Sequence, residues 1–132
     1  MVSRLSQFIH LYQTMIRLTI IFIPIVISAI AQIVLKTGVG STNTAAGLTS
    51  FFSKMLTSPV VLLGLGLYGI GALLWLIVLS REDVSFAFPL VSFAYVLAIF
   101  LSAIFLKETI TPGRILGATA IMAGIFIIAR FG

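Results

Sequence analysis

The stretch LTIIFIPIVISAIAQIVL, residues Leu18–Leu35, determines the class of this protein. It carries no charged side chain, and Lys36 closes it. Its length is close to the ~20 residues that a helix needs to cross the ~30 Å hydrocarbon core of a bilayer. Similar apolar stretches follow at Pro59–Leu79, Val84–Leu106 and Pro112–Ala129. We therefore expect the chain to cross a membrane four times.

The composition supports this class. Of the 132 residues, 61% are hydrophobic and 8% are charged, whereas a soluble domain typically carries about 25% charged residues. A membrane bundle satisfies its backbone hydrogen bonds inside each helix and can expose apolar side chains to lipid. We predict an all-α integral membrane protein in which residues 18–132 form one four-helix transmembrane domain. The net charge of +5 then indicates contact with anionic lipid headgroups rather than with nucleic acid.

Two segments outside the spans have the pattern of helices that lie in the membrane interface. Residues 1–17 place apolar side chains three and four apart, with basic and amide side chains between them. A plain extension of the first span is the alternative. Thr37–Thr44 is rich in Gly, Ser, Thr and Asn and is predicted to be a loop. Ala45–Leu56 is predicted to be the second interfacial helix, with Lys54 facing the headgroups.

Prolines mark helix starts and irregular points. Ser58-Pro59 and Thr111-Pro112 each place an N-cap hydroxyl residue before a proline at the first helical position. Pro24 and Pro89 instead lie inside predicted spans, where each frees one backbone carbonyl. Neighbouring side chains or water must satisfy these carbonyls within a membrane. We expect the two spans to be irregular there.

The acidic residues all lie between the spans. They are Glu82, Asp83 and Glu108. Small transporters that exchange a proton for a cation usually need a carboxylate at the bilayer midplane, so the sequence argues against that activity. Cysteine is absent, and His10 is the single histidine. We expect no metal site and no cofactor. We also expect no enzymatic activity, because the spans contain no carboxylate pair and no nucleophile pair.

The first span carries a polar stripe. Ser28, Gln32 and Lys36 recur every four residues on one helix face. An amide in hydrocarbon is costly unless it faces protein or a cavity, so Gln32 should point inward. It would either line a path or only hydrogen-bond a neighbouring helix. Lys36 would either reach the interface as an anchor or bind an anionic headgroup.

Further candidates lie on the second and third spans. Ser92 and Tyr95 follow the proline break of the third span. Tyr68 and Trp75 are seven residues apart on the second span and could line the same cavity. Packing or interfacial anchoring is the alternative for these two aromatic residues.

The basic residues that flank the spans are balanced. One side carries Arg4, Arg17, Arg81 and Arg130, and the other carries Lys36, Lys54, Lys107 and Arg114. The positive-inside rule therefore favours neither orientation. This balance is expected of a protein whose copies insert both ways and pair antiparallel.

The last span carries a candidate pairing face. Its small residues at helical spacing are Gly113, Gly117, Ala120 and Gly124. They share one face and permit close approach of another helix. That helix would belong either to a partner chain or to the same bundle.

Three short segments carry a family resemblance. AQIVLK at Ala31–Lys36, VSFAFPL at Val84–Leu90 and FLKET at Phe105–Thr109 resemble the drug/metabolite transporter superfamily, whose small multidrug resistance branch consists of four-helix antiparallel dimers. In that branch the coupling glutamate stands eight residues before the lysine that closes the first span. Ser28 occupies this position here. Ser92 and its neighbours likewise replace the glycine pair that kinks the family's third helix.

Within the superfamily, the chain is similar to the subunits that flip aminoarabinose-linked undecaprenyl phosphate and to single EamA-type repeats. This similarity implies a lipid-linked anionic substrate of the polyisoprenyl-phosphate type, moved between leaflets of the bacterial inner membrane. It also implies an antiparallel homodimer or a heterodimer with a similar subunit. Ser28, Gln32, Ser92 and Tyr95 would line the path, and Lys36 and Arg114 would meet the phosphate.

Two alternatives remain open from the sequence. The first is a small-molecule exporter of cationic drugs, of the small multidrug resistance type, in which Glu82 or Glu108 would have to serve as the coupling residue. The second is a non-transporting membrane subunit that scaffolds a partner enzyme.

Overall fold

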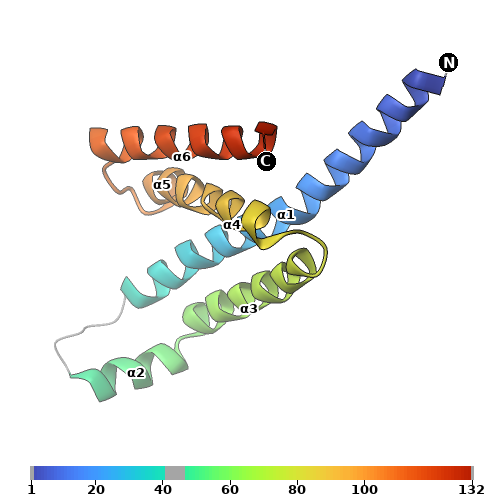
Figure 1. The fold of residues 1–132 in the computed structure, drawn as a ribbon. Coiled ribbons are helices and arrows are strands. Elements are labelled where there is room, and N and C mark those ends of the chain that lie inside the picture. Colours follow the sequence, from blue (N-terminus) through green and yellow to red (C-terminus); the bar gives the residue numbers. More distant parts are fainter. Residues whose placement is uncertain (1, 41–46, 132) are drawn as a thin grey trace.

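The described residues form six helices and no strand. The computed structural model describes the backbone of residues 2–40 and 47–131. In chain order the helices are α1 (Val2–Gly40), α2 (Leu48–Thr57), α3 (Pro59–Leu79), α4 (Val84–Val91), α5 (Phe93–Phe105) and α6 (Pro112–Phe131). Figure 1 shows α1 and α3 running side by side, with α4 and α5 across α1 and α6 on their outer side.

The all-α prediction and the four predicted spans are confirmed. Helical segments long and apolar enough to cross a membrane are Tyr12–Gly40, Pro59–Leu79, Val84–Phe105 and Pro112–Phe131. The prediction of a loop from Thr37 is wrong for its first residues, because α1 continues to Gly40. Residues 41–44 lie outside the described part.

The extension of α1 has a packing reason. Gly38 is buried against the start of α3, where a Cβ on it would lie 2.7 Å from Cγ2 of Val61. Thr37 also donates its hydroxyl hydrogen to the carbonyl of Ile33 at 2.9 Å, within the same helix. The contact with α3 therefore stabilises a helical turn that the local sequence favours only weakly.

Glycines set the distance between α1 and α3. A Cβ on Gly64 would lie 2.8 Å from two side-chain carbons of Leu35, and one on Gly71 would lie 2.6 Å from Oγ of Ser28. These two contacts are one heptad apart on each helix, in opposite directions, as in antiparallel coiled-coil packing. Such close approach is typical of helix pairs in membranes, where small residues let the backbones come together.

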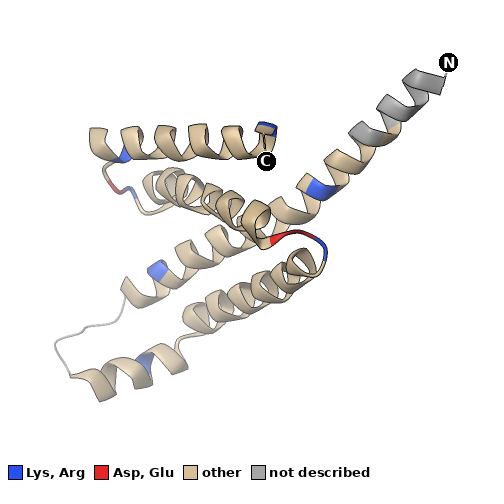
Figure 2. Cartoon of the chain, in the orientation of Figure 1, with Lys and Arg blue, Asp and Glu red and all other residues tan. Residues whose placement is uncertain are grey.

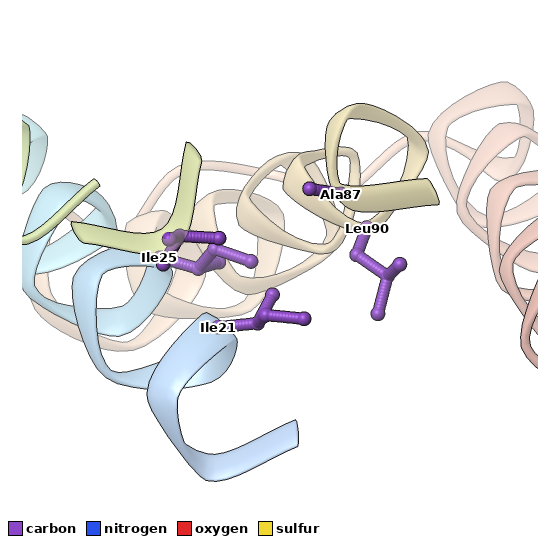
Figure 3. Packing of buried hydrophobic residues seen from close by; sticks show 5 residues of the cluster. Ile21, Ile25, Ala87 and Leu90 are labelled. Carbon is purple, nitrogen blue, oxygen red and sulfur yellow. The ribbon is translucent and has the colours of Figure 1, made fainter. Parts of the chain in front are cut away.

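The apolar core lies where α1, α3 and α4 meet. Its buried members are Ile21, Ile25, Val78, Ala87 and Leu90. Figure 3 shows side chains of α1 and α4 pointing into this shared space. The core joins the start of the third span to the helix pair, and α5 extends the contact with α1, as in the edge-to-face pair of Phe22 and Phe93.

The third span is broken. The sequence predicts one irregular span over Val84–Leu106, and the structure divides it at Ser92 into α4 and α5. Ser92 donates its amide hydrogen to the Pro89 carbonyl at 3.1 Å, and Tyr95 donates to the Ser92 carbonyl at 3.1 Å. These three-residue bonds tighten the turn that follows the proline. Pro24, by contrast, lies buried within an unbroken α1.

The predicted helix starts are confirmed. Oγ of Ser58 accepts the Val61 amide at 3.5 Å, and Oγ1 of Thr111 accepts the Arg114 amide at 3.4 Å. Each hydroxyl satisfies one of the backbone donors left free in the first turn of its helix.

The two predicted interfacial helices are helical, but their place in a membrane stays a prediction. Residues 2–17 continue into the first span without a break, as the alternative of a simple extension expects. The side chains of Arg4 and His10 lie outside the described part. The second helix begins at Leu48 rather than Ala45, which is itself outside the described residues. Its apolar stripe of Leu48, Phe52 and Leu56 is exposed.

The glycine contact can be tested within α3. Gly64→Ala should lower the free energy of unfolding by about 1–3 kcal/mol, because its Cβ would overlap Leu35 both at the side chain and at the backbone amide, 3.1 Å away. Gly66→Ala is the control, since a Cβ there meets no atom within 4 Å. It should stabilise the helix by about 0.5–1 kcal/mol. Unfolding in increasing sodium dodecyl sulfate, followed by circular dichroism, measures both changes, and equal stability of the two variants would contradict the register.

Candidate functional site

Two adjoining hollows lie between α1 and the third span, and α3 also lines the first of them. The first, named here the inner cavity, has a volume of about 290 Å³, and its lining includes Ser28, Gln32, Tyr68, Trp75, Phe88 and Tyr95. The second, named the outer groove, has a volume of about 460 Å³, and its lining includes Gln32, Lys36, Tyr95, Ser102, Glu108 and Arg114. Gln32, Tyr95 and Ala98 line both. The two hollows therefore adjoin each other along the C-terminal half of α1, and they are together named the path here.

The inner cavity is aromatic and neutral. Trp75 of α3 and Phe88 of α4 meet edge to face, with ring centroids 6.1 Å apart. The polar groups are the Ser28 hydroxyl, the Gln32 amide and two tyrosine hydroxyls, and the described lining includes no acidic or basic side chain. Ser28 also fills the space beside Gly71, so it both packs α1 against α3 and faces the cavity. Such a cavity suits a neutral polar group with flat faces.

The outer groove is charged. Nζ of Lys36 lies 3.6 Å from Oε1 of Glu108, and Arg114 lines the same groove. The Lys36 side chain is 65% exposed and the Glu108 side chain 35% exposed. Arg114 is held in place by a hydrogen bond from Nη1 to the Thr109 carbonyl at 3.3 Å. The mouth of the path therefore presents two cations and one carboxylate.

The loop between α5 and α6 places Glu108. Lys107 adopts the left-handed backbone conformation, with φ 54°, which is uncommon for a residue with a side chain. The chain reverses there, and the Glu108 amide donates to the Ser102 carbonyl at 3.2 Å. This bond fixes the backbone of Glu108 above the end of α5, with its carboxylate toward Lys36.

The structure brings five of the six predicted substrate-binding residues together along the path. Ser28, Gln32 and Tyr95 line the inner cavity, and Lys36 and Arg114 line the outer groove. Ser92 lines neither hollow and lies instead at the break between α4 and α5.

The sequence reasoning missed two residues as site residues. Phe88 lines the inner cavity and Glu108 lines the outer groove. Phe88 lies directly before Pro89 in the broken third span, and this position beside a predicted irregular point could have indicated a cavity residue. The sequence suggests Glu108 only as a coupling residue of the alternative drug exporter, because its approach to Lys36 depends on the turn at Lys107. Tyr68 and Trp75, for which the sequence favours packing or interfacial anchoring, both line the inner cavity.

The opposite end of the apolar stretch Leu18–Leu35 carries a tighter ion pair. Arg17 binds Glu82 through two bonds, Nη2 to Oε2 and Nε to Oε1, the latter at 2.8 Å. The guanidinium also lies 5.7 Å from the ring centre of Phe86. The Glu82 side chain is only 7% exposed, against 60% for Arg17. Figure 2 shows the acidic residues in the loops between helices, and the two ion pairs of α1 lie at either end of the apolar stretch Leu18–Leu35.

The predicted pairing face of α6 is open within the chain. A Cβ on Gly113, Gly117 or Gly124 would meet no atom within 4 Å, and Ala120 is exposed. Among the described residues, no neighbouring helix fills the space beside these glycines. The alternative that these small residues serve packing within the same bundle therefore lacks support from the geometry.

Comparison with known proteins identifies relatives over most of the chain. The EamA-like transporter family matches residues 5–130. The probable 4-amino-4-deoxy-L-arabinose-phosphoundecaprenol flippase subunit ArnF of Erwinia tasmaniensis is 32% identical over 111 residues, which cover 79% of this chain and 87% of the relative. No solved structure matches the chain.

Shorter matches are found to relatives named as subunit ArnE. The probable flippase subunit ArnE of Pseudomonas savastanoi is 35% identical over 68 residues, 52% of this chain and 60% of the relative. ArnE of Yersinia pestis is 39% identical over 61 residues, 46% of this chain and 54% of the relative. The chain thus matches little more than half the length of these two relatives.

The Arg17–Glu82 pair predicts a pH dependence. The hydrogen bonds from Arg17 lower the pKa of the Glu82 carboxyl below its usual range, although partial burial opposes this shift. Because the folded-state pKa is depressed, the pair contributes fully to stability above about pH 5, and the contribution is lost as the pH falls through the lowered value.

Glu82→Gln should therefore lower the free energy of unfolding by about 1 kcal/mol at pH 7, a value discounted for the exposure of Arg17. It should also lose less stability than the wild type between about pH 5 and pH 3. Detergent unfolding at several pH values measures both effects. Asp83→Asn, in the same loop, is the control. A wild-type acid response that persists in Glu82→Gln would rule out this pair as its source.

Proposed function

The chain belongs to the EamA-like transporter family, and on this premise we propose that it moves a lipid-linked anionic molecule between the leaflets of the bacterial cytoplasmic membrane. The family and the relatives are transporters, and the chain is a multi-pass membrane transporter rather than an enzyme. The proposed substrate is of the polyisoprenyl-phosphate type. The observation that carries this proposal is the change in chemistry along the path, from a neutral aromatic cavity to a cationic mouth.

The cationic mouth suits a phosphate. Lys36 and Arg114 both line the outer groove and come from different helices, α1 and α6. Charged donors bind phosphate oxygens through hydrogen bonds that are about twice as strong as neutral ones. Lys36 lies near the end of α1, and Arg114 lies near the start of α6. The ends of membrane-spanning helices reach the headgroup region of the bilayer, which is also the depth of a lipid phosphate. A phosphate held there would leave its isoprenoid chain free to remain among the lipid tails.

The inner cavity suits the group that the phosphate carries. Aromatic rings and neutral hydrogen-bonding groups bind a sugar by stacking and by polar contacts, with no charge required. The names of the relatives specify a phosphoundecaprenol that carries an amino sugar. We propose that Gln32 and Tyr95, which line both hollows, contact the substrate at the junction of sugar and phosphate.

Export of cationic drugs fits the geometry less well. The described lining of the inner cavity contains no carboxylate, and Ser28 packs there against Gly71. Glu82 is bound to Arg17, at the other end of the apolar stretch Leu18–Leu35, and Glu108 lies in the outer groove. A scaffolding subunit would have no need of such a path between its helices.

We further propose that the transporter works as a dimer. The open glycine face of α6 is the proposed contact, with Gly113, Gly117, Ala120 and Gly124 at its centre. The relatives are named as flippase subunits, which supports pairing with a second subunit of similar kind. The balanced basic residues support an antiparallel arrangement, either of two copies or of this chain with its partner.

Replacement of Lys36 tests the phosphate contact. Lys36→Gln should weaken binding of a polyprenyl phosphate by roughly tenfold to a hundredfold, the cost of a charge-assisted hydrogen bond of about 1.5–3 kcal/mol. Lys36→Arg should retain binding. Titration of the full chain in nanodiscs measures the affinities.

Lys54→Gln is the matched control, because Lys54 is exposed on α2 and outside the lining of the groove. Wild-type affinity in Lys36→Gln, or an equal loss in Lys54→Gln, would make Lys36 a membrane anchor only. The phosphate contact would then have to come from Arg114.

Orientation tests the proposed pairing. Two lysines added to one loop should give every copy the same orientation, because the basic residues are balanced without them. If an antiparallel homodimer is the working unit, this variant should be inactive alone and regain activity beside a variant biased the other way. Cysteine labelling from each side of the membrane confirms orientation, and lipid translocation in vesicles measures activity. Full activity of a uniformly oriented variant would exclude the antiparallel homodimer.

A further inference from the structure

The outer groove contains a charge that a simple phosphate site does not need. Its two cations, Lys36 and Arg114, are accompanied by the carboxylate of Glu108, 3.6 Å from the lysine ammonium. The nominal charge of this cluster is therefore +1 rather than +2. The backbone holds Glu108 in this position. Lys107 adopts a left-handed conformation, and the Glu108 amide donates a hydrogen bond to the Ser102 carbonyl, which orients the loop toward the groove.

We propose that Glu108 makes the groove select a phosphodiester over a phosphomonoester. This inference rests on the proposed function, since it concerns the phosphate group of the transported lipid. A phosphodiester carries one negative charge, whereas a monoester carries about −1.5 to −2 at pH 7. A lipid carrier that bears its headgroup through phosphate is a diester, and the carrier without headgroup is a monoester. Glu108 would therefore distinguish the loaded carrier from the empty one.

The physical reason is a balance of attraction and desolvation. Attraction to the cluster grows in proportion to the charge of the ligand, whereas the cost of taking that charge out of water grows with its square. A cluster of net charge +1 compensates one negative charge best. A second negative charge would gain little from Lys36, which already has Glu108 as a partner, and would be repelled by the same carboxylate.

A pair of short lipids that differ by one methyl group tests this selection. Farnesyl phosphate is the monoester probe and methyl farnesyl phosphate is the diester probe. Their affinities are measured for the full chain in phosphatidylcholine nanodiscs at pH 7.5, for the wild type, Glu108→Gln and Asp83→Asn. The last variant removes one negative charge from the loop at the other end of the bundle, where Asp83 is exposed.

Removal of the Glu108 charge should strengthen binding of both probes, and the monoester should gain more because it carries more charge. The wild type should bind the diester at least as tightly as the monoester. In Glu108→Gln the ratio of affinities should shift toward the monoester by roughly threefold to tenfold, the effect of about one charge near a protein surface. Asp83→Asn should keep the wild-type ratio. An unchanged ratio in Glu108→Gln, or an equal shift in Asp83→Asn, would overturn the inference.

Lowering the pH gives a second measurement on the wild type. A phosphomonoester takes up a proton near pH 6 and carries about one charge at pH 5. The preference for the diester should therefore shrink at about pH 5, and a preference that stays constant would argue against selection by charge.

Two further outcomes separate the possible failures. Failure of the wild type to bind either probe would refute the proposed function itself, whereas binding of both probes with the same ratio in every variant would refute only the role of Glu108. The diester chemistry also occurs in bulk phospholipid. Phosphatidylglycerol in tenfold excess should leave methyl farnesyl phosphate bound, and its displacement would overturn the assignment to an isoprenoid lipid.

Discussion

The close antiparallel contact between α1 and α3 is the interaction on which the other features depend. Lipid tails are as apolar as leucine, so two helices in a membrane associate through close packing rather than through the hydrophobic effect. Gly64 and Gly71 supply that closeness against Leu35 and Ser28, one heptad apart. Because this contact determines which face of α1 meets α3, the neighbouring face with Gln32 is left to line the hollows toward α5.

The two ion pairs that flank the apolar stretch Leu18–Leu35 of α1 differ in exposure and length. Arg17 and Glu82 form a doubly bonded pair, nearly buried on the acidic side, which joins α1 to the loop between α3 and α4. Lys36 and Glu108 form a longer and more exposed pair at the other end, within a groove that also contains Arg114. A ligand with negative charge can compete with a long, solvated pair far more easily than with a short, buried one. The Lys36 end is therefore the end at which the path can accept a charged headgroup.

Several parts of the site could be predicted from the sequence because their cause is local. The four-residue spacing of Ser28, Gln32 and Lys36 places them on one face of any helix, and all three line the path. Glu108 could not be assigned in the same way, because its position depends on the left-handed conformation of Lys107. Glycine or asparagine usually occupies such a position, and lysine gives no sign of it in the sequence. The sequence predicts Ser92 as a site residue because it follows Pro89. It lies at the break between α4 and α5 but lines neither hollow.

The sequence by itself determined the class, the number of spans and the starts of α3 and α6. The length of an apolar stretch determines whether its helix can cross a membrane, and a hydroxyl residue before a proline determines where a helix begins. Both are properties of a single helix, so they do not depend on the rest of the chain. Only the tertiary structure decided that α1 continues past Lys36, that the third span divides at Ser92, and which acid pairs with which base. Arg17 and Glu82 are 65 residues apart in the chain. Such pairs form only after the helices have packed, because contacts between distant residues are set by the register of the packed helices and not by any local pattern.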